Sequence, residues 1–192
     1  MKKIVLYGAG GHCISLINLI ERTKKFKIIG IIGKKKELNK NILNYKVNYT
    51  DGDLISLQKK CKFLALSITN YLNLKKRDLL IKKLSNSFIL PNIISRNAKI
   101  SKHIKMGIGN QIFDDVIINA GSIIGSHCVI NHKSLLEHNV FVKNNVHIST
   151  GCIINGNCFI EDNSFIGSGS ILRQDVKIGK NKFVKMGSII KK

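Results

Sequence analysis

The sequence predicts a mixed fold class: a small Rossmann-like α/β domain at residues 1–92, followed by a left-handed parallel β-helix at residues 93–192. Three observations support this prediction. Aliphatic residues recur at every sixth position of the second half, corner-forming residues recur with the same period, and strand-like and helix-like segments alternate before them. Such alternation is typical of a small parallel sheet covered by helices.

The first domain is expected to contain strands at 2–7, 26–32, 62–68 and 87–90, and helices at 13–20, 54–60 and 74–84. These segments are short apolar runs for the strands and apolar residues at helical spacing for the helices. The only proline, Pro91, marks the passage to the repeats.

A glycine-rich turn follows the first expected strand and contains Gly8, Gly10, Gly11 and His12. Such a turn before a helix presents backbone N–H groups to a phosphate. As a dinucleotide fingerprint it is weak, because Cys13 replaces the third glycine and no acidic residue ends the 26–32 strand. A nucleotide-linked sugar therefore fits the turn better than NAD, and a purely structural turn remains open.

The repeat begins at Ile100, and each sixth residue through Ile190 is Ile, Val, Leu or Met. The residue two places earlier is mostly small or β-branched. The residue three places later is mostly Gly, Asn or Asp, which tolerate left-handed backbone angles. We therefore expect each hexapeptide to be one short strand and one corner, with three hexapeptides making one coil of a triangular prism.

The five cysteines are expected to be reduced and buried. Their number is odd and no CxxC occurs, so neither a disulfide framework nor a zinc knuckle is predicted. Cys128, Cys152 and Cys158 fall on the small inward position of the repeat, which favours a role as core filler over catalysis or metal binding.

The formal charge of +21 suggests a polyanionic partner, but the lysines are dispersed and no nucleic-acid-binding module accompanies them. We expect no nucleic acid, although a basic surface attracts phosphorylated small molecules. No apolar run is long enough to span a membrane, and the first run is too short for a signal peptide. A cytoplasmic protein is therefore expected.

The combination of features resembles a known family. A Gly-Ala-Gly-Gly-His turn after the first strand, an α/β domain, uninterrupted hexapeptides and the segment around Asn131, His138 and His147 are similar to the sugar acyltransferases. That family includes sialic-acid O-acetyltransferases and bacillosamine-type UDP-4-amino-sugar N-acetyltransferases. The resemblance implies acetyl transfer from acetyl-CoA to an amine or hydroxyl of a nucleotide-linked or related sugar, in bacterial surface-glycan or nonulosonate biosynthesis. It also implies a homotrimer with active sites between subunits.

By motif, His138 matches the general base of that family. Acyl transfer from a thioester needs a base to accept a proton from the attacking group, and imidazole titrates in the appropriate range. Asn139 stands where the family often has a carboxylate, and Glu137 precedes the base. We therefore assign His138, Glu137 and Asn139 to the catalytic group.

The resemblance also implies binding residues. Asn131 matches an asparagine near the acceptor, His147 a histidine that contacts the thioester carbonyl, and Gly156 a glycine whose backbone faces the coenzyme. The turn at Gly8, Gly10, Gly11 and His12 would bind the nucleotide sugar. Because His138 and His147 are separated by a whole face of the prism, we expect them to meet only across a subunit boundary.

Two other functions remain open. A γ-class carbonic anhydrase shares the β-helix, and His127 and His132 have an attractive spacing, but their register within the repeat does not match that family and His103 falls at a corner. No metal site is predicted. A catalytically silent binding or scaffold protein is the second alternative, because a fold does not fix a function.

Overall fold

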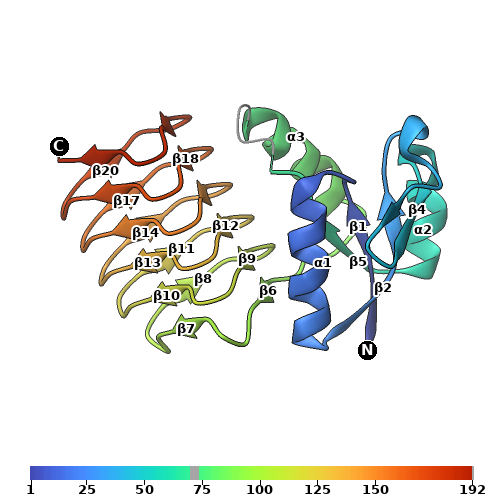
Figure 1. Cartoon of the computed structure of the whole chain (residues 1–192), viewed down its shortest axis with the longest axis horizontal. Coiled ribbons are helices and arrows are strands. Elements are labelled where there is room, and N and C mark those ends of the chain that lie inside the picture. The colour runs from blue at the N-terminus through green and yellow to red at the C-terminus, as the bar shows by residue number, and fades with distance from the viewer. Residues whose placement is uncertain (70–73, 192) are drawn as a thin grey trace. The chain divides into compact units, whose positions relative to one another are not determined.

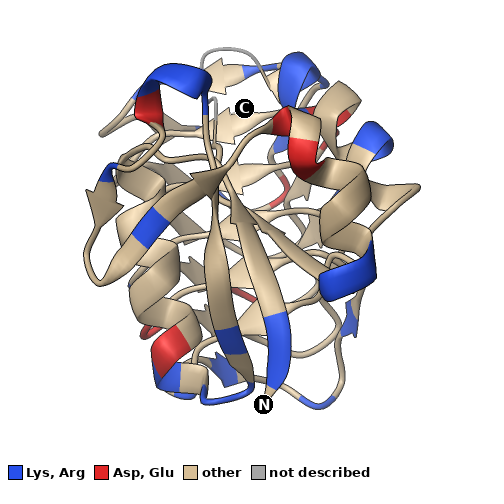
Figure 2. Cartoon of the chain, turned by 90° about the vertical axis from the view of Figure 1, so that its right-hand side faces the viewer, with Lys and Arg blue, Asp and Glu red and all other residues tan. Residues whose placement is uncertain are grey.

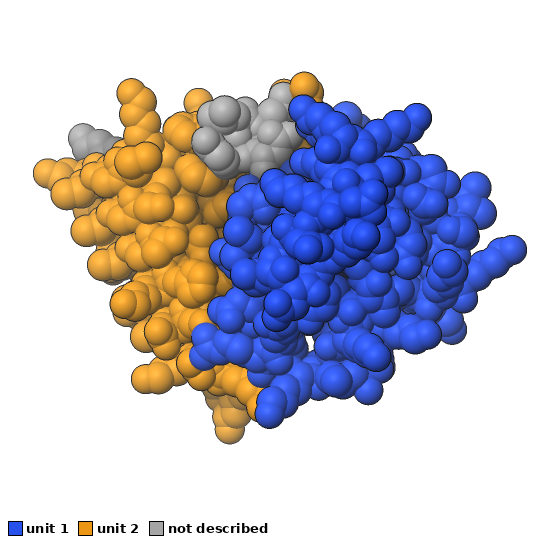
Figure 3. Space-filling model, turned by 45° about the vertical axis from the view of Figure 1, so that its right-hand side comes forward, with its two compact units in different colours: residues 1–69, 79–91 blue, residues 70–78, 92–192 orange. Residues whose placement is uncertain are grey.

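The computed structural model describes residues 1–69 and 74–191, which form two compact units (Figure 1, Figure 3). The first unit contains residues 1–69 and 79–91, and the second contains residues 74–78 and 92–191 of the described chain. The first is an α/β domain and the second is a left-handed parallel β-helix, which confirms the predicted fold class. In the part of the chain that is described, none of the helices combines the length and apolarity needed to cross a membrane.

The first unit is built on a five-stranded sheet with the strand order β3-β4-β2-β1-β5. Only β3 runs antiparallel to its neighbour. The strands are β1 (Lys2–Tyr7), β2 (Phe26–Ile32), β3 (Asn41–Ile42), β4 (Tyr45–Tyr49) and β5 (Phe63–Leu66). The helices are α1 (Gly11–Thr23), α2 (Leu54–Lys60) and α3 (Leu74–Ser85), with 3-10 turns η1 (Lys35–Glu37) and η2 (Asp51–Asp53).

The core of this unit forms because β1 and β5 are apolar on both faces, as expected for central parallel strands. Val5, Leu57 and Leu84 belong to one buried cluster, which joins β1 to α2 and α3. Figure 2 shows Lys and Arg on several separate elements of the ribbon.

Several elements differ from the sequence expectation, which also lacked the two-residue strand β3. The strand at Tyr45–Tyr49 was missed because its polar Lys46 and Asn48 are exposed and only Val47 is fully buried. The expected strand at 87–90 is reduced to one bridge between Phe63 and Ile89. Helix α1 begins at Gly11 rather than at residue 13, because the glycine turn itself supplies the first helical turn.

The second unit is a prism with three walls of parallel two-residue strands. The first wall comprises β7 (Lys99–Ile100), β10 (Ile117–Ile118), β13 (Leu135–Leu136), β16 (Ile153–Ile154), β19 (Ile171–Leu172) and β22 (Ile189–Ile190). The second wall comprises β8 (Lys105–Met106), β11 (Ile123–Ile124), β14 (Phe141–Val142), β17 (Phe159–Ile160) and β20 (Lys177–Ile178). The third wall comprises β6 (Ile93–Ile94), β9 (Gln111–Ile112), β12 (Val129–Ile130), β15 (His147–Ile148), β18 (Phe165–Ile166) and β21 (Phe183–Val184).

The aliphatic at each sixth position points into the prism, as predicted. From Ile112 through Val184 these side chains are buried in one continuous cluster, and Ile100, Met106 and Ile190 pack against its ends. Each full burial of such a side chain contributes about 1.5–3 kcal/mol. The hydrophobic column is therefore the main source of stability of the β-helix.

The corners adopt left-handed backbone angles with the same period. Every sixth residue from Gly109 to Gly187 has a φ between 53° and 76°. Most are Gly, Asn or Asp, as expected, but His127 and Lys133 also take this conformation. A left-handed backbone conformation is energetically unfavourable for these residue types, so packing and hydrogen bonds from the neighbouring coils must stabilise it.

The small inward residues bind the backbone of the next coil. Ser122 Oγ donates to the Glu137 carbonyl at 2.9 Å, and Cys128 Sγ donates to the Lys143 carbonyl at 3.0 Å. The same offset recurs at Ser134, Cys152, Cys158, Ser164 and Ser170. The three thiols are buried, which confirms the core-filler interpretation, and burial raises the pKa of Cys128 to about 12.

One corner of the β-helix holds a buried cation. Arg77, in the first turn of α3, donates to the His127 carbonyl at 2.8 Å and to Asn145 Oδ1. Asn145 Nδ2 in turn donates to the Leu74 carbonyl at 2.8 Å. Burial, and then the charge of Arg77, lowers the pKa of His127 to about 4. The folded state therefore holds this imidazole neutral.

This environment predicts a pH-dependent loss of stability. The folded pKa of His127 lies below its ordinary value of 6.5, so the unfolded chain binds a proton first as the pH falls. The contribution of neutral His127 to the free energy of unfolding is therefore fully present above pH 6.5. It is lost as the pH falls from about 6.5 to 4, and its size is about 1–2 kcal/mol after allowance for solvent screening. Asn occupies the same register at 145, 163 and 181, so His127→Asn should fold and should lose less stability over this range. Urea unfolding at several pH values measures the difference, and parallel pH profiles for both proteins would refute it.

Candidate functional site

The first unit contains a cavity of about 620 Å³ at the carboxyl ends of β1, β2 and β4. Crevices at this edge of a parallel sheet are where open α/β folds bind ligands. The lining brings the glycine turn together with two lysines and two carboxylates: Gly8, Gly10, Lys34, Lys35, Glu37 and Asp51.

The glycine turn keeps its backbone accessible. A Cβ added at Gly10 or Gly11 would meet no atom within 4 Å, so the space beside the start of α1 is open. Gly8 has a φ of +115° and lies against Ile68, so a side chain there is excluded. His12 lies in the first turn of α1 and is half-buried. Free N–H groups at a helix start attract an anion such as a phosphate.

The two carboxylates of the cavity were not identified from the sequence as binding groups. Asp51 accepts a hydrogen bond from the Tyr7 hydroxyl at 2.6 Å, and burial together with Asp51 raises the pKa of Tyr7 above its usual range. Glu37 accepts the Lys34 backbone N–H at 2.7 Å and so closes the turn after β2. Asp51 is not needed as a cap of the following 3-10 turn, because Asp53 closes that turn by accepting the Thr50 N–H at 2.8 Å.

In the second unit, His138 lies at the corner between the first and second walls. Its ring is exposed, and Asn139 Nδ2 lies 3.3 Å from His138 Nδ1. Glu137 Oε2 accepts a hydrogen bond from Asn119 Nδ2 at 2.9 Å, so this carboxylate is directed along the wall. Of the two chain neighbours, Asn139 is the one whose side chain contacts the His138 ring, while Glu137 is bonded to Asn119.

Gly156 supports the imidazole from the next coil. A Cβ at Gly156 would lie 2.5 Å from His138 Cε1 and 2.6 Å from its Nε2. Two unbonded heavy atoms cannot approach so closely, so the ring rests directly on the glycine. Glycine at 156 therefore sets the position of the His138 side chain.

The backbone at position 139 restricts the residue type without fixing it as Asn. Its φ is 56°, and its register is the left-handed corner that recurs along the prism. Asp115 and Asp175 occupy the same register with φ of 58° and 66°. The corner therefore accepts either an amide or a carboxylate, and the choice of Asn over Asp here affects chemistry rather than folding.

The other assigned residues lie elsewhere on the prism. His147 is 6% exposed on the third wall, where its ring meets Phe165 at a centroid distance of 5.0 Å. Asn131 follows β12 at the end of a third-wall strand, and its Oδ1 accepts the His132 backbone N–H at 2.9 Å. In a triangular prism the corner between the first and second walls is opposite the third wall. Within one chain, His138 is thus separated from His147.

His132 and His127, the pair considered as possible metal ligands, both have packing partners. His132 packs against Phe113 at a centroid distance of 4.8 Å, and His127 lies at the corner that Arg77 contacts. Among residues 1–69 and 74–191, no group of three or more His, Cys, Asp or Glu side chains is arranged to hold a metal ion.

Comparison with protein families identifies the first domain. Residues 3–84 match the family described as the PglD N-terminal domain. No curated protein sequence matches the chain.

Comparison with solved structures extends the similarity to the whole chain. A variant of perosamine N-acetyltransferase from Caulobacter crescentus, in complex with CoA and GDP-perosamine, superposes with a TM-score of 0.92 at 23% identity, over 100% of this chain and 90% of that one. The acetyltransferase domain of PglB from Neisseria gonorrhoeae, in complex with acetyl coenzyme A, gives 0.86 at 23% identity, over 98% and 92%. WeeI from Acinetobacter baumannii gives 0.85 at 24% identity, over 100% and 92%. The resemblance drawn from the sequence is confirmed for the first domain and for the fold.

The contact between Gly156 and His138 predicts the effect of one added methyl group. Gly156→Ala should fold, because this glycine has no left-handed φ, but its Cβ should displace the imidazole. The displacement should change the ¹H and ¹³C shifts of the His138 ring. Gly179→Ala is the matched control, because its Cβ would meet only Lys182 at 3.8 Å. An unchanged His138 ring in Gly156→Ala would show that the glycine does not position it.

Proposed function

We propose that this protein is an acetyltransferase that moves the acetyl group of acetyl-CoA to an amine, or a hydroxyl, of a nucleotide-linked sugar. The observation that carries the proposal is the exposed His138 imidazole, which rests on Gly156 and is oriented by Asn139 at a corner of the β-helix. The two CoA-bound proteins of the same fold are an N-acetyltransferase and an acetyltransferase domain, which supports this reaction class.

The acceptor sugar is proposed to be bound mainly by its nucleotide part, in the cavity of the first unit. In the proposed complex the pyrophosphate lies at the start of α1, near Gly8, Gly10 and Gly11, where backbone N–H groups and the helix dipole favour negative charge. Lys34 and Lys35 line the same cavity and add positive charge. His12 stands in the first turn of this helix and is proposed to bind the nucleotide sugar there. Asn131, at the end of a β-helix strand, is proposed separately to lie near the acceptor group.

His138 acts as the general base in the proposed reaction. It accepts a proton from the acceptor nitrogen or oxygen as that atom attacks the thioester carbonyl. The new bond to carbon forms, the carbon–sulfur bond breaks, and the proton passes from His138 to the departing CoA thiolate. Asn139 orients the imidazole, while Glu137, directed toward Asn119, contributes negative charge nearby.

The coenzyme is proposed to bind along the β-helix, with the Gly156 backbone facing it and His147 at the thioester carbonyl. Hydrogen-bond donors at that oxygen stabilise the oxyanion that develops during acyl transfer. Because His138 and His147 lie on opposite sides of one prism, this arrangement requires a second copy of the chain. We therefore propose a homotrimer with sites between subunits.

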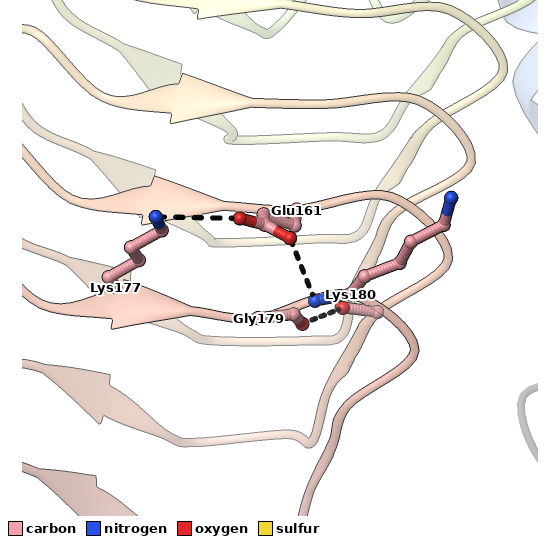
Figure 4. Close-up of polar contacts among 5 residues, drawn as sticks. Glu161, Lys177, Gly179 and Lys180 are labelled. Atoms are coloured by element: carbon pink, nitrogen blue, oxygen red, sulfur yellow. Dashed lines mark hydrogen bonds and ion pairs between the residues drawn. The ribbon is translucent and has the colours of Figure 1, made fainter.

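The first wall is the proposed contact surface between copies. Its outward residues form an aliphatic row: Ile117, Leu135, Ile153, Ile171 and Ile189. The second wall is more polar, since Lys143 and Lys177 lie over the Phe159 ring at 5.6 and 5.5 Å. Lys177 also pairs with Glu161 at 3.6 Å (Figure 4). Contiguous exposed apolar rows of this kind are typical of protein interfaces.

A cytoplasmic site of action completes the proposal. Acetyl-CoA and nucleotide sugars are intracellular metabolites, and the buried free thiols suit a reducing compartment.

The role of His138 predicts the result of its removal. His138→Ala should lower acetyl-CoA-dependent thiol release by about 10²–10⁴-fold, the usual contribution of a general base. The assay uses acetyl-CoA with UDP-, GDP- and CMP-linked amino sugars, and sedimentation checks that assembly is unchanged. His103→Ala is the matched control, because His103 is exposed at the same corner of the prism, nearer its start. Undiminished turnover in His138→Ala would remove this residue from the mechanism. No turnover in the wild type with any donor and acceptor tested would favour a silent binding protein.

The aliphatic row predicts the effect of a charge on assembly. Ile153→Lys should convert trimers to monomers, because Ile153 is 37% exposed in the middle of the first wall and a buried lysine at an interface is costly. Ile123→Lys, at 36% exposure on the second wall, should leave the trimer intact. Analytical ultracentrifugation distinguishes the two results. A trimeric Ile153→Lys variant, or a monomeric wild type, would contradict the proposed interface.

A further inference from the structure

The order of the sheet determines where ligand groups can lie in the cavity of the first unit. Strands β4, β2 and β1 are consecutive neighbours, and the residues that follow them line the cavity: Asp51, Gly33 and Gly8. Neighbouring strands are about 4.8 Å apart, so the end of β4 is about 10 Å from the end of β1. A phosphate at the start of α1, beside β1, is therefore about 10 Å from Asp51.

No acidic residue directly follows β2, the strand next to the proposed phosphate position, and the nearest carboxylate there is that of Glu37. In dinucleotide-binding folds, an acidic residue that follows this strand binds the ribose hydroxyls. Here Gly33 and Lys34 follow β2, and a Cβ at Gly33 would lie 2.7 Å from Val47 Cγ1. Glu37 reaches back only to the Lys34 N–H, at 2.7 Å. The ribose position is consequently lined by backbone, by Lys34 and by the Glu37 carboxylate, one of whose oxygens would lie 3.1 Å from a Cβ at Gly33.

The carboxylate of Asp51 lies one strand further from the phosphate, where the base of a nucleoside diphosphate is expected. Tyr7, the last residue of β1, reaches across the end of β2, and its hydroxyl donates to Asp51 Oδ1 at 2.6 Å. Because Tyr7 remains protonated, it fixes Asp51 as a hydrogen-bond acceptor. Asp51 itself is exposed and lines the cavity.

A fixed carboxylate discriminates between bases by their donors. Guanine presents two adjacent N–H groups, N1–H and N2–H, which match the two oxygens of a carboxylate. Uracil presents one N–H between two carbonyl oxygens, and both carbonyls repel a carboxylate. Cytosine presents only one amino group beside an acceptor nitrogen. A matched pair of hydrogen bonds of this type contributes about tenfold or more of discrimination between bases in nucleic-acid recognition.

We propose that Asp51, positioned by Tyr7, selects a guanine nucleotide as the carrier of the acceptor sugar. This inference rests on the proposed function only in taking the cavity as the nucleotide site. It makes Asp51 a specificity residue and Tyr7 a positioning residue.

The test compares nucleotide binding by isothermal titration of the whole chain with GDP, UDP, CDP and IDP. The wild type should bind GDP about tenfold or more tightly than UDP or CDP. IDP, which lacks the 2-amino group, should be intermediate. Asp51→Asn should remove the preference by weakening GDP binding about tenfold without weakening UDP binding, because the neutral amide no longer repels the uracil carbonyls. Tyr7→Phe should reduce the GDP-to-UDP ratio, a change that a general loss of structure does not cause. Glu21→Gln is the matched control, because Glu21 accepts the Tyr45 hydroxyl at 2.9 Å away from the cavity lining.

Three results would overturn the inference. Equal or tighter binding of UDP, an equal loss of all nucleotides in Asp51→Asn, or no nucleotide binding at all would each do so. Acetyl transfer to a UDP-linked amino sugar, but not to a GDP-linked one, would refute the guanine selection and leave the proposed acetyltransferase function intact. Absence of acetyl transfer with every sugar, together with a clear GDP preference, would instead count against the proposed function alone.

Discussion

The left-handed turn at every sixth residue is the constraint on which the β-helix depends. From Gly109 to Gly187 the chain takes a positive φ at each such position, and each turn redirects the backbone from one wall of the prism to the next. Between turns only two residues pair as strand, and one of them must be apolar to fill the axis. The same constraint applies at the corner that contains His138, since Asn139 is one of these turn residues. Its side chain lies beside His138 because the backbone turns there.

Because the coils stack closely, small residues are required at two kinds of position: the inward serines and cysteines, and Gly156 on the surface. The inward serines and cysteines fit between walls and satisfy carbonyl groups that would otherwise be buried without a partner. Gly156 extends the same principle to the surface, where the absence of a side chain allows the His138 ring to rest on the next coil. A rigid, repeating backbone thus holds an exposed imidazole in one place, which is the preorganisation that acid–base chemistry requires.

The cavity of the first unit depends on a different constraint, the order of parallel strands. Because β2 separates β1 from β4, the glycine turn and Asp51 face one another across about 10 Å. Tyr7 spans that distance with a single side chain. The proposed phosphate end and the carboxylate end of the cavity therefore come from segments more than forty residues apart, since Tyr7 and Asp51 are separated by 44 residues in the chain.

The sequence by itself determined the periodic part of this protein. The inward column from Ile112 to Val184, the corner residues and the buried Cys128, Cys152 and Cys158 all follow from a local rule repeated every six residues. Helix α2 and the glycine turn were also predicted from the sequence, because each depends on a short run of neighbouring residues. Only the tertiary structure decided that Tyr7 meets Asp51, that Gly156 supports His138, and that Arg77 is buried against His127. Strand β4 escaped prediction because its two flanking polar side chains are exposed. The physical reason is common to these cases. Which strands become neighbours depends on the free energy of the whole packed unit, as do the side-chain contacts between distant segments. Such contacts produce no periodic pattern in the sequence.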